Sequence, residues 1–103
     1  MITVIEDKSE YKNENIVRLT EIVFDKCGVG GDLVIKDWDI NRIYITKERR
    51  SKWMIRTWNI RKNSKGRVVI DWTLFKMKPD GSNAERDKGR GRTVIKNKKE
   101  GRT

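Results

Sequence analysis

Histidine is absent from this chain of 103 residues, and cysteine and proline each occur once. Without an imidazole the chain cannot build a Ser-His-Asp triad or a Cys-His pair, and it lacks the commonest metal ligand. A single cysteine cannot form an internal disulfide or a zinc site made of several thiolates. We therefore expect a protein that is not an enzyme and that holds no metal and no cofactor.

Two weaker catalytic patterns remain in the sequence. A histidine-free ribonuclease using Tyr44, Lys47 and Arg56 as donors is chemically feasible, but no spacing in the sequence requires it. Asp37 and Asp39 would share one face of an extended strand, yet no third metal ligand accompanies them. Acidic pairs at turns more often accept backbone hydrogen bonds, so neither pattern changes the expectation.

Long apolar stretches are also missing. Apolar residues make up 35% of the chain and charged residues 39%. No apolar run approaches the roughly 18–20 residues of a membrane span, and the first residues lack the basic-then-apolar order of a signal peptide. We therefore expect a cytoplasmic protein that makes no membrane contact, with a length that fits one domain.

The charge that is present is strongly segregated along the chain. Residues 1–39 carry five basic and nine acidic side chains, a net charge of −4. Residues 40–78 carry twelve basic and two acidic side chains, a net charge of +10, and residues 79–103 add a further +4. Solubility requires neither this magnitude nor this segregation. The pattern therefore indicates a surface that binds a polyanion, on a body whose other side is acidic.

The N-terminal part of the chain predicts one strand and one helix. Residues 1–5 are β-prone, and residues 9–26 place apolar side chains at helical spacing. Cys27 continues this apolar stripe, so we interpret it as a small core residue and not as a nucleophile. Gly28 suits the position just beyond the helix, where the backbone turns left-handed.

From Leu33 onward the apolar period changes to two, which is typical of strands. Candidate strands cover residues 33–38, 43–46, 53–61 and 67–78, and Gly66 can supply a positive φ in the turn between the last two. We therefore predict an α+β fold in which one N-terminal amphipathic helix packs on a curved antiparallel sheet of four to five strands. The folded domain would span residues 1–78.

Residues 79–103 form the remaining segment, and they are basic and poor in apolar side chains. A turn signature at Pro79, Asp80 and Gly81 separates them from the last strand, and only Ala84, Val94 and Ile95 are apolar. Burial of so few apolar side chains cannot offset the ordering entropy of the segment. We therefore predict a flexible basic tail, within which residues 93–96 would form a short strand in the presence of a partner.

The strand over residues 67–78 is apolar on both faces. Val68, Ile70, Trp72 and Leu74 would line one face, and Val69, Thr73, Phe75 and Met77 the other. One helix covers only one face, so the second must be covered by curvature of the sheet, by a ligand or by a second copy of the chain. This excess of apolar surface favours a homodimer.

Aromatic and cationic side chains are interleaved in the same region. All four tryptophans lie between positions 38 and 72, and strand alternation places Arg56 and Trp58 on one face. A guanidinium there can contact phosphate while the indole ring stacks on a base. We expect Trp53 and Trp72 in the core and Trp58 at the surface. The predicted phosphate-contacting residues are Arg49, Arg50, Lys52, Arg56, Arg61, Lys62, Lys65 and Arg67, and the predicted stacking residues are Tyr44 and Trp58.

These features predict a non-enzymatic nucleic-acid-binding protein that uses a basic, aromatic-bearing sheet. Loops at the same end of a meander can gather their cations into one rim, but the sequence does not give the strand order. Single-stranded DNA or RNA is favoured because no helix-turn-helix or basic helix is visible. The alternative is a small protein-interaction factor, of phage or mobile-element type, that docks on a nucleic-acid-processing complex and regulates or inhibits it. The patterns do not identify the chain as a member of a known family.

Overall fold

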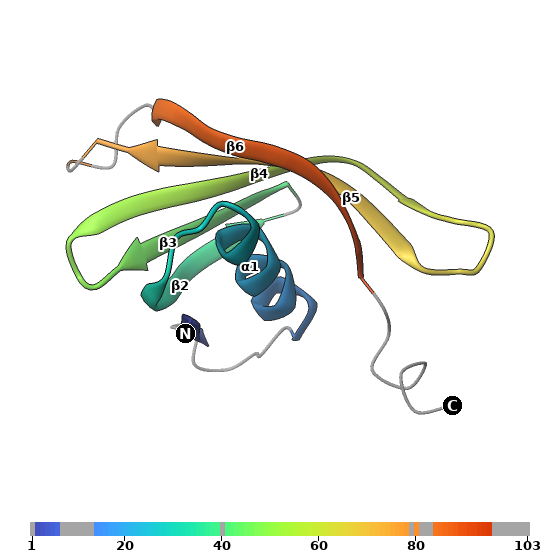
Figure 1. Cartoon of the computed structure of the whole chain (residues 1–103), viewed down its shortest axis with the longest axis horizontal. Coiled ribbons are helices and arrows are strands. Elements are labelled where there is room, and N and C mark those ends of the chain that lie inside the picture. The colour runs from blue at the N-terminus through green and yellow to red at the C-terminus, as the bar shows by residue number, and fades with distance from the viewer. Residues whose placement is uncertain (1, 7–13, 40, 79, 81–83, 96–103) are drawn as a thin grey trace.

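A six-stranded sheet with one helix makes up the part of the chain that the computed structural model describes, residues 2–6, 14–39, 41–78, 80 and 84–95. The elements are β1 (Ile2–Glu6), α1 (Glu14–Lys26), β2 (Gly31–Asp39), β3 (Arg42–Lys47), β4 (Ser51–Lys62), β5 (Val68–Met77) and β6 (Ala84–Ile95). Strand order follows chain order (Figure 1). β1 pairs in parallel with β2, and β2 to β6 form a five-stranded antiparallel meander. The expected α+β class is confirmed at this level.

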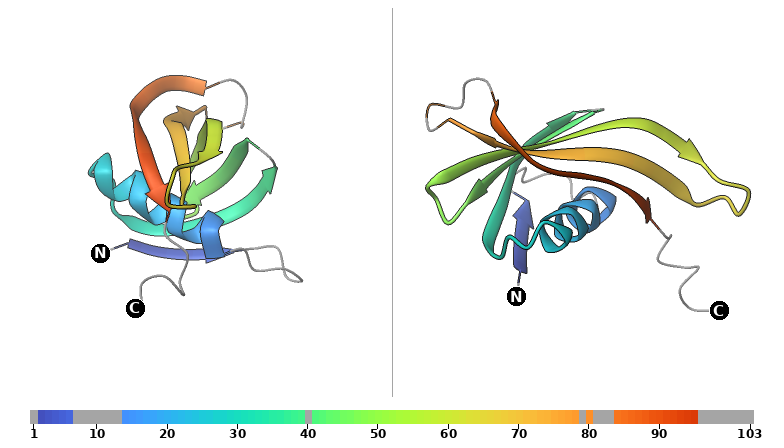
Figure 2. Two further views of the ribbon diagram at one scale, coloured as in Figure 1. Left: turned by 90° about the vertical axis from the view of Figure 1, so that its right-hand side faces the viewer. Right: turned by 45° about the horizontal axis from the view of Figure 1, so that its top comes forward.

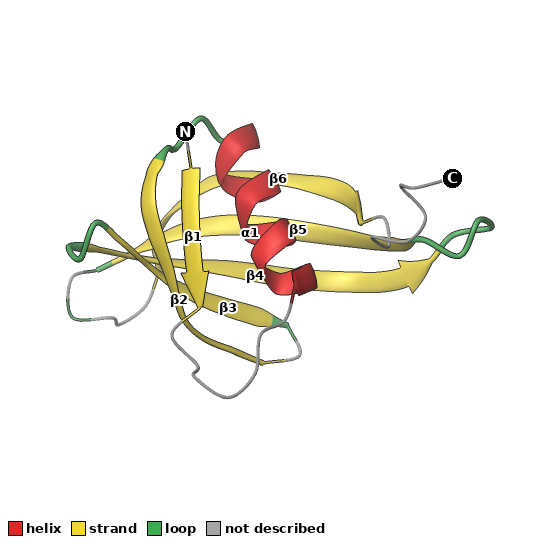
Figure 3. Ribbon diagram, turned by 90° about the horizontal axis from the view of Figure 1, so that it is seen from below, coloured by secondary structure: helices red, strands yellow, loops and turns green. Residues whose placement is uncertain are grey.

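α1 lies across one face of the sheet, which we call the inner face (Figure 3). Its buried residues are Leu19, Thr20, Val23 and Phe24. Leu19 and Val23 lie on the stripe that the sequence predicts, whereas the burial of Thr20 and Phe24 was not predicted. Beyond the helix, the Val29 N–H donates to the Phe24 carbonyl at 2.9 Å and the Gly28 N–H donates to the Asp25 carbonyl at 3.0 Å. Gly28 has a φ of 70°, so the predicted left-handed termination is confirmed.

The core fills the space between α1 and the inner face. It is built mainly from one aliphatic or aromatic side chain at every second position of β2 to β5: Leu33, Ile35, Ile43, Ile45, Trp53, Ile55, Ile70, Trp72 and Leu74. Trp53 and Trp72 are both buried, as predicted, and Trp53 meets the ring of Phe24 edge-on at 5.5 Å between centroids. Each fully buried side chain of this size contributes about 1.5–3 kcal/mol.

Residues 84–95 form β6, so the prediction of a flexible tail is wrong for this part of the segment. The inner-face positions of β6 include Gly89 and Gly91, and their missing side chains are replaced by neighbours. A Cβ built on Gly89 would lie 2.6 Å from Cys27 Sγ, and one on Gly91 would lie 2.8 Å from Trp72 Cζ2. At these two positions Cys27 and Trp72 supply the buried side chains, and β6 itself adds Thr93 and Ile95. The remaining residues of the predicted tail, 79, 81–83 and 96–103, lie outside the described residues.

Gly91→Ala should destabilise the fold by about 1–3 kcal/mol, because the new methyl group overpacks Trp72. In an ordinary strand the same change would raise stability by roughly 0.5–1 kcal/mol, so the sign is diagnostic. Urea unfolding followed by tryptophan fluorescence measures the difference. Lys88→Ala on the same strand has an exposed side chain and should change stability by less than about 0.5 kcal/mol. A stabilised Gly91→Ala variant would contradict the contact.

Candidate nucleic-acid interface

The sheet face opposite α1, the outer face, is the candidate binding surface. Within the described residues no helix covers it (Figure 2). Strand alternation and register place on it Arg42 and Tyr44 from β3, Lys52, Met54, Arg56 and Trp58 from β4, Val69, Asp71, Thr73 and Phe75 from β5, and Arg90, Arg92 and Val94 from β6. Basic side chains from β3, β4 and β6 thus meet on one surface.

A row of arginines crosses the middle of the outer face. Arg42 lies directly opposite Arg56, which lies opposite Thr73, which in turn lies opposite Arg90 on β6. Arg42 and Arg56 are exposed, and no carboxylate of the described residues forms an ion pair with either, although Asp39 is in register with Arg42. Like charges directly opposite one another destabilise a sheet. An anion between the two guanidinium groups would relieve this repulsion.

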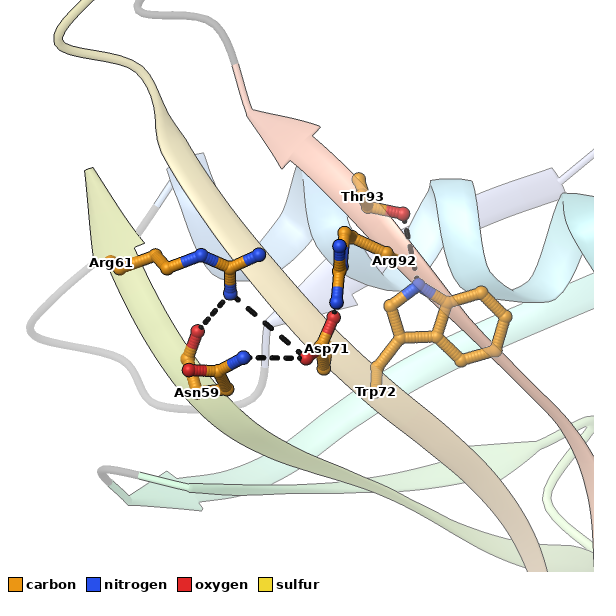
Figure 4. Close-up of polar contacts among 6 residues, drawn as sticks. All are labelled: Asn59, Arg61, Asp71, Trp72, Arg92 and Thr93. Carbon is orange, nitrogen blue, oxygen red and sulfur yellow. Dashed lines mark hydrogen bonds and ion pairs between the residues drawn. The ribbon is translucent and has the colours of Figure 1, made fainter. Parts of the chain in front are cut away.

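Asp71 organises a second group of cations on the same face (Figure 4). Arg92 Nε donates to Asp71 Oδ1 at 2.7 Å, and Asn59 Nδ2 donates to Asp71 Oδ2 at 2.9 Å. Arg61 Nη1 lies 3.9 Å from Asp71 Oδ2 and donates to the Asn59 carbonyl at 2.7 Å. The Arg92 hydrogen bond, followed by that from Asn59, lowers the pKa of Asp71. One carboxylate therefore orients two arginines and leaves the group positively charged.

A bulge in β4 between Trp58 and Arg61 makes this group possible. Asn59 has a φ of 53°, a conformation that asparagine tolerates better than most residues. Strict alternation would place the Asn59 side chain with Trp53 on the inner face, but at the bulge it reaches Asp71 instead. Trp58 is 43% exposed, so its predicted surface position is confirmed.

The predicted loop cations separate into two groups at opposite ends of β4. Arg49 and Arg50 occupy the β3–β4 turn, whereas Lys62, Lys65 and Arg67 lie at the tip of the β4–β5 hairpin (Figure 1). Successive turns of a meander alternate between the two ends of the sheet, so the observed strand order does not bring these loop cations into one rim. Lys52, Arg56 and Arg61 lie along β4 between these groups.

The hairpin tip projects beyond α1 and is held by its own backbone and Asn63 (Figure 3). Asn63 Oδ1 accepts from the N–H of Lys65 at 2.9 Å and from the N–H of Arg67 at 3.1 Å. Gly66 has a φ of 76°, as its place in the predicted turn requires. Lys62 and Lys65 are exposed on this ordered turn, and Arg67 is half-buried beside it.

Three outer-face arginines, Arg42, Arg90 and Arg92, were not among the residues that the sequence predicted. For the two on β6, the signal was the alternation of glycine and arginine over residues 89–92, which has the period of a strand. Arg90 Nη2 donates to Asp87 Oδ2 at 2.6 Å, so this arginine is paired. Tyr44, a predicted stacking residue, is only half-exposed and is less open to a base than Trp58.

Apolar side chains on the outer face are less exposed than the sequence suggests. Val69 and Thr73 of β5 are buried, and Phe75 is half-buried. Large exposed apolar side chains among the described residues are Trp58, Ile60 and Val94. The apolar surface that favoured a homodimer is therefore small, and the dimer stays a prediction.

The remaining candidates make local contacts. Asp37 Oδ1 accepts from the Trp38 N–H at 2.8 Å and Asp39 Oδ1 from the Asn41 N–H at 3.1 Å, and no three potential metal-ligating side chains cluster among the described residues. Burial, with a smaller effect of Asp87, raises the pKa of the Cys27 thiol and so disfavours the reactive thiolate. In the described ranges no helix is long and apolar enough to cross a membrane.

Comparisons of the chain with protein-family models, with characterised proteins and with solved structures yield no match. A functional assignment must therefore come from the chemistry of the outer face and of the two ends of β4.

Asp71→Asn should lower the melting temperature at pH 7, because the charge that Arg92 and Asn59 hold is lost. Because the pKa of Asp71 is lowered in the folded state, its carboxylate stabilises the fold at pH values above the ordinary pKa of about 3.9. This stabilisation is lost as the pH falls through the lower pKa of the folded state. The difference in melting temperature between the wild type and Asp71→Asn should therefore become smaller below about pH 4. Thermal unfolding by circular dichroism from pH 7 to pH 2 measures it, and a constant difference would contradict the electrostatic role.

Proposed function

We propose that this chain is a non-enzymatic, cytoplasmic nucleic-acid-binding protein whose outer face takes up single-stranded DNA or RNA. The observation that carries the proposal is the opposed pair Arg42 and Arg56, which has no carboxylate partner among the described residues and lies beside the exposed ring of Trp58. Phosphates relieve the repulsion between the two guanidinium groups, and unpaired bases find an aromatic surface.

Trp58 and Arg56 suit adjacent parts of one nucleotide. They lie two positions apart on β4 and share the outer face, so their side chains are neighbours. Stacking of one base on an exposed aromatic ring is worth about 1–3 kcal/mol, and the contact tolerates any base. Binding at this site is therefore expected to depend on charge and on unpaired bases more than on sequence.

The acidic surface of α1 favours a single-stranded nucleic acid over a duplex as the ligand. Duplex readers commonly insert a helix into the major groove, where its exposed side chains meet phosphates and base edges. Glu21 and Asp25 are exposed on α1 and would repel the DNA backbone. The basic residues instead lie across a sheet, a platform that presents aromatic and cationic side chains to unstacked bases.

A protein partner is the second candidate, and the exposed aliphatic side chains favour it. Ile60 is 49% exposed and Val94 is 44% exposed, and neither can stack as an aromatic ring does. Aliphatic and arginine side chains together are common at protein interfaces. On this alternative the outer face docks on an acidic surface of a nucleic-acid-processing complex. Failure to bind any oligonucleotide at about 50 mM salt would favour this candidate, because electrostatic binding of nucleic acid strengthens steeply at low salt.

Arg56→Glu should raise the stability of the fold and weaken nucleic-acid binding. The change replaces a like-charge pair with Arg42 by an opposite-charge pair, worth about 0.2–1 kcal/mol. Loss of a charge-assisted contact should weaken binding of an oligonucleotide about tenfold and reduce the salt slope by about 0.7 or more. Fluorescence polarisation at several salt concentrations and urea unfolding measure the two effects.

The matched control for Arg56→Glu is Lys26→Glu, which makes the same change of net charge in the last turn of α1. This variant should retain most of the binding affinity, since Lys26 lies on the helix side of the sheet. Equal losses in both variants would mean that net charge alone drives binding and that the outer face is not the site.

Trp58→Ala should weaken binding by about 1–3 kcal/mol and leave the chain folded, because Trp58 is 43% exposed and lies outside the core cluster. Trp58→Phe keeps an aromatic surface and should recover much of the affinity. Polarisation titrations with poly-pyrimidine oligonucleotides measure binding, and circular dichroism measures folding. Unchanged affinity in Trp58→Ala would remove this residue from the interface, and unfolding of the variant would show that its ring is structural.

A further inference from the structure

We infer that a single strand of nucleic acid runs along the length of β4, from the β3–β4 turn, over Arg56 and Trp58, to the tip of the β4–β5 hairpin. This inference rests on the proposed function and adds the direction of the strand, its two ends and its footprint. The ligand is a phosphodiester chain with unpaired bases, a chemistry that DNA and RNA share.

β4 provides a line of cations. Its twelve residues contain no acidic side chain. Lys52, Arg56 and Arg61 lie on the outer face, whereas Lys62 is in register with Val68 and ends the strand on the inner-face side. The line continues into exposed cations beyond both ends of the strand, at Arg49 and Arg50 in one turn and at Lys65 in the other. Asp71, the carboxylate facing the middle of this line from β5, is already engaged by Arg92 and Asn59. A polyanion lying along the outer face of β4 therefore meets Lys52, Arg56 and Arg61 in turn, with exposed cations beyond both ends of the strand.

A path across the strands, along the row of arginines, is shorter, and an acidic side chain lies at one end of it. Adjacent strands are about 4.8 Å apart, so the row from Arg42 to Arg90 spans only about 14 Å. Asp39 lies beyond Arg42 in this row and would repel the next phosphate, and Asp87 already binds Arg90. Trp58 also lies off this row and on the line of β4.

The length of β4 sets the footprint. At about 3.3 Å per residue the strand extends about 40 Å, close to the longest dimension of the molecule, 43 Å. A stacked single strand advances about 3.4 Å per nucleotide, which gives about twelve nucleotides. A more extended strand needs about half as many, and both values fall within the range of about 4–16 nucleotides for a small single-strand-binding domain.

A length series combined with end-specific variants tests the path. The probes are fluorescent oligo-dT and oligo-U of 4, 8, 12 and 16 nucleotides, and the readout is polarisation at two salt concentrations with the full chain. The variants are Arg49→Ala with Arg50→Ala at one end, Lys62→Ala with Lys65→Ala at the other, and Arg42→Ala with Arg90→Ala across the sheet. All are surface changes, and circular dichroism checks that each variant is folded.

On the proposed path, affinity should rise steeply up to about 8–12 nucleotides and then level off. Each end pair should weaken binding of the 12-mer about fivefold and lower its salt slope by about 1.4, because two phosphate contacts are lost. The same pairs should change binding of the 4-mer less than twofold, since a short strand can sit over Trp58 alone. Comparison of oligo-dT with oligo-U shows which sugar the site prefers.

Two results would overturn the path in different ways. Full affinity for the 4-mer, with a loss only in the variant of Arg42 and Arg90, would place the strand across the sheet; the proposed function would stand and this inference would fall. No binding of any oligonucleotide by the wild-type chain at about 50 mM salt would overturn both. A 12-mer that loses affinity in only one end pair would also contradict a path that reaches both ends.

Discussion

The contact between Trp72 and β6 determines which side chains the outer face presents. The indole ring occupies the space that Gly91 leaves open, and its Nε1–H donates to Thr93 Oγ1 at 2.9 Å in the core. This contact specifies one register for β6, because a slip of one residue would turn every side chain of the strand to the other face. In the observed register Arg90 and Arg92 point away from α1. The core therefore fixes the positions of surface charges on the strand that contributes few core side chains of its own.

The arginines of the outer face differ in how firmly they are held. Arg92 and Arg61 lie against Asp71, so part of their side-chain entropy is lost before any ligand arrives. Arg42 and Arg56 have no ion pair within the described part of the chain and repel each other. An oriented group and a strained pair on one surface would play different parts in recognition, the first positioning a ligand and the second contributing net attraction.

Much of the fold follows from periodicity in the sequence. The helical stripe with Gly28 after it, the period-two strands and the turn at Gly66 all predict elements that the structure contains, and the burial of Trp53, Trp72 and exposure of Trp58 follow from alternation. β6 could not be predicted this way, because its stability comes from Trp72 and Cys27, which lie elsewhere in the chain. The bulge at Asn59 depends on Asp71, twelve residues away, and the separation of the loop cations depends on strand order.

β6 is also the last strand in the sheet order, so its outward side borders no further strand among the described residues. Edge strands offer backbone groups to which other chains can add, and charged side chains are a common protection against such growth. Arg90 and Arg92 would meet like charges if two copies paired antiparallel through this edge. Their positive charge thus disfavours aggregation by strand addition at β6, and any self-association of this chain should use a surface other than this edge of the sheet.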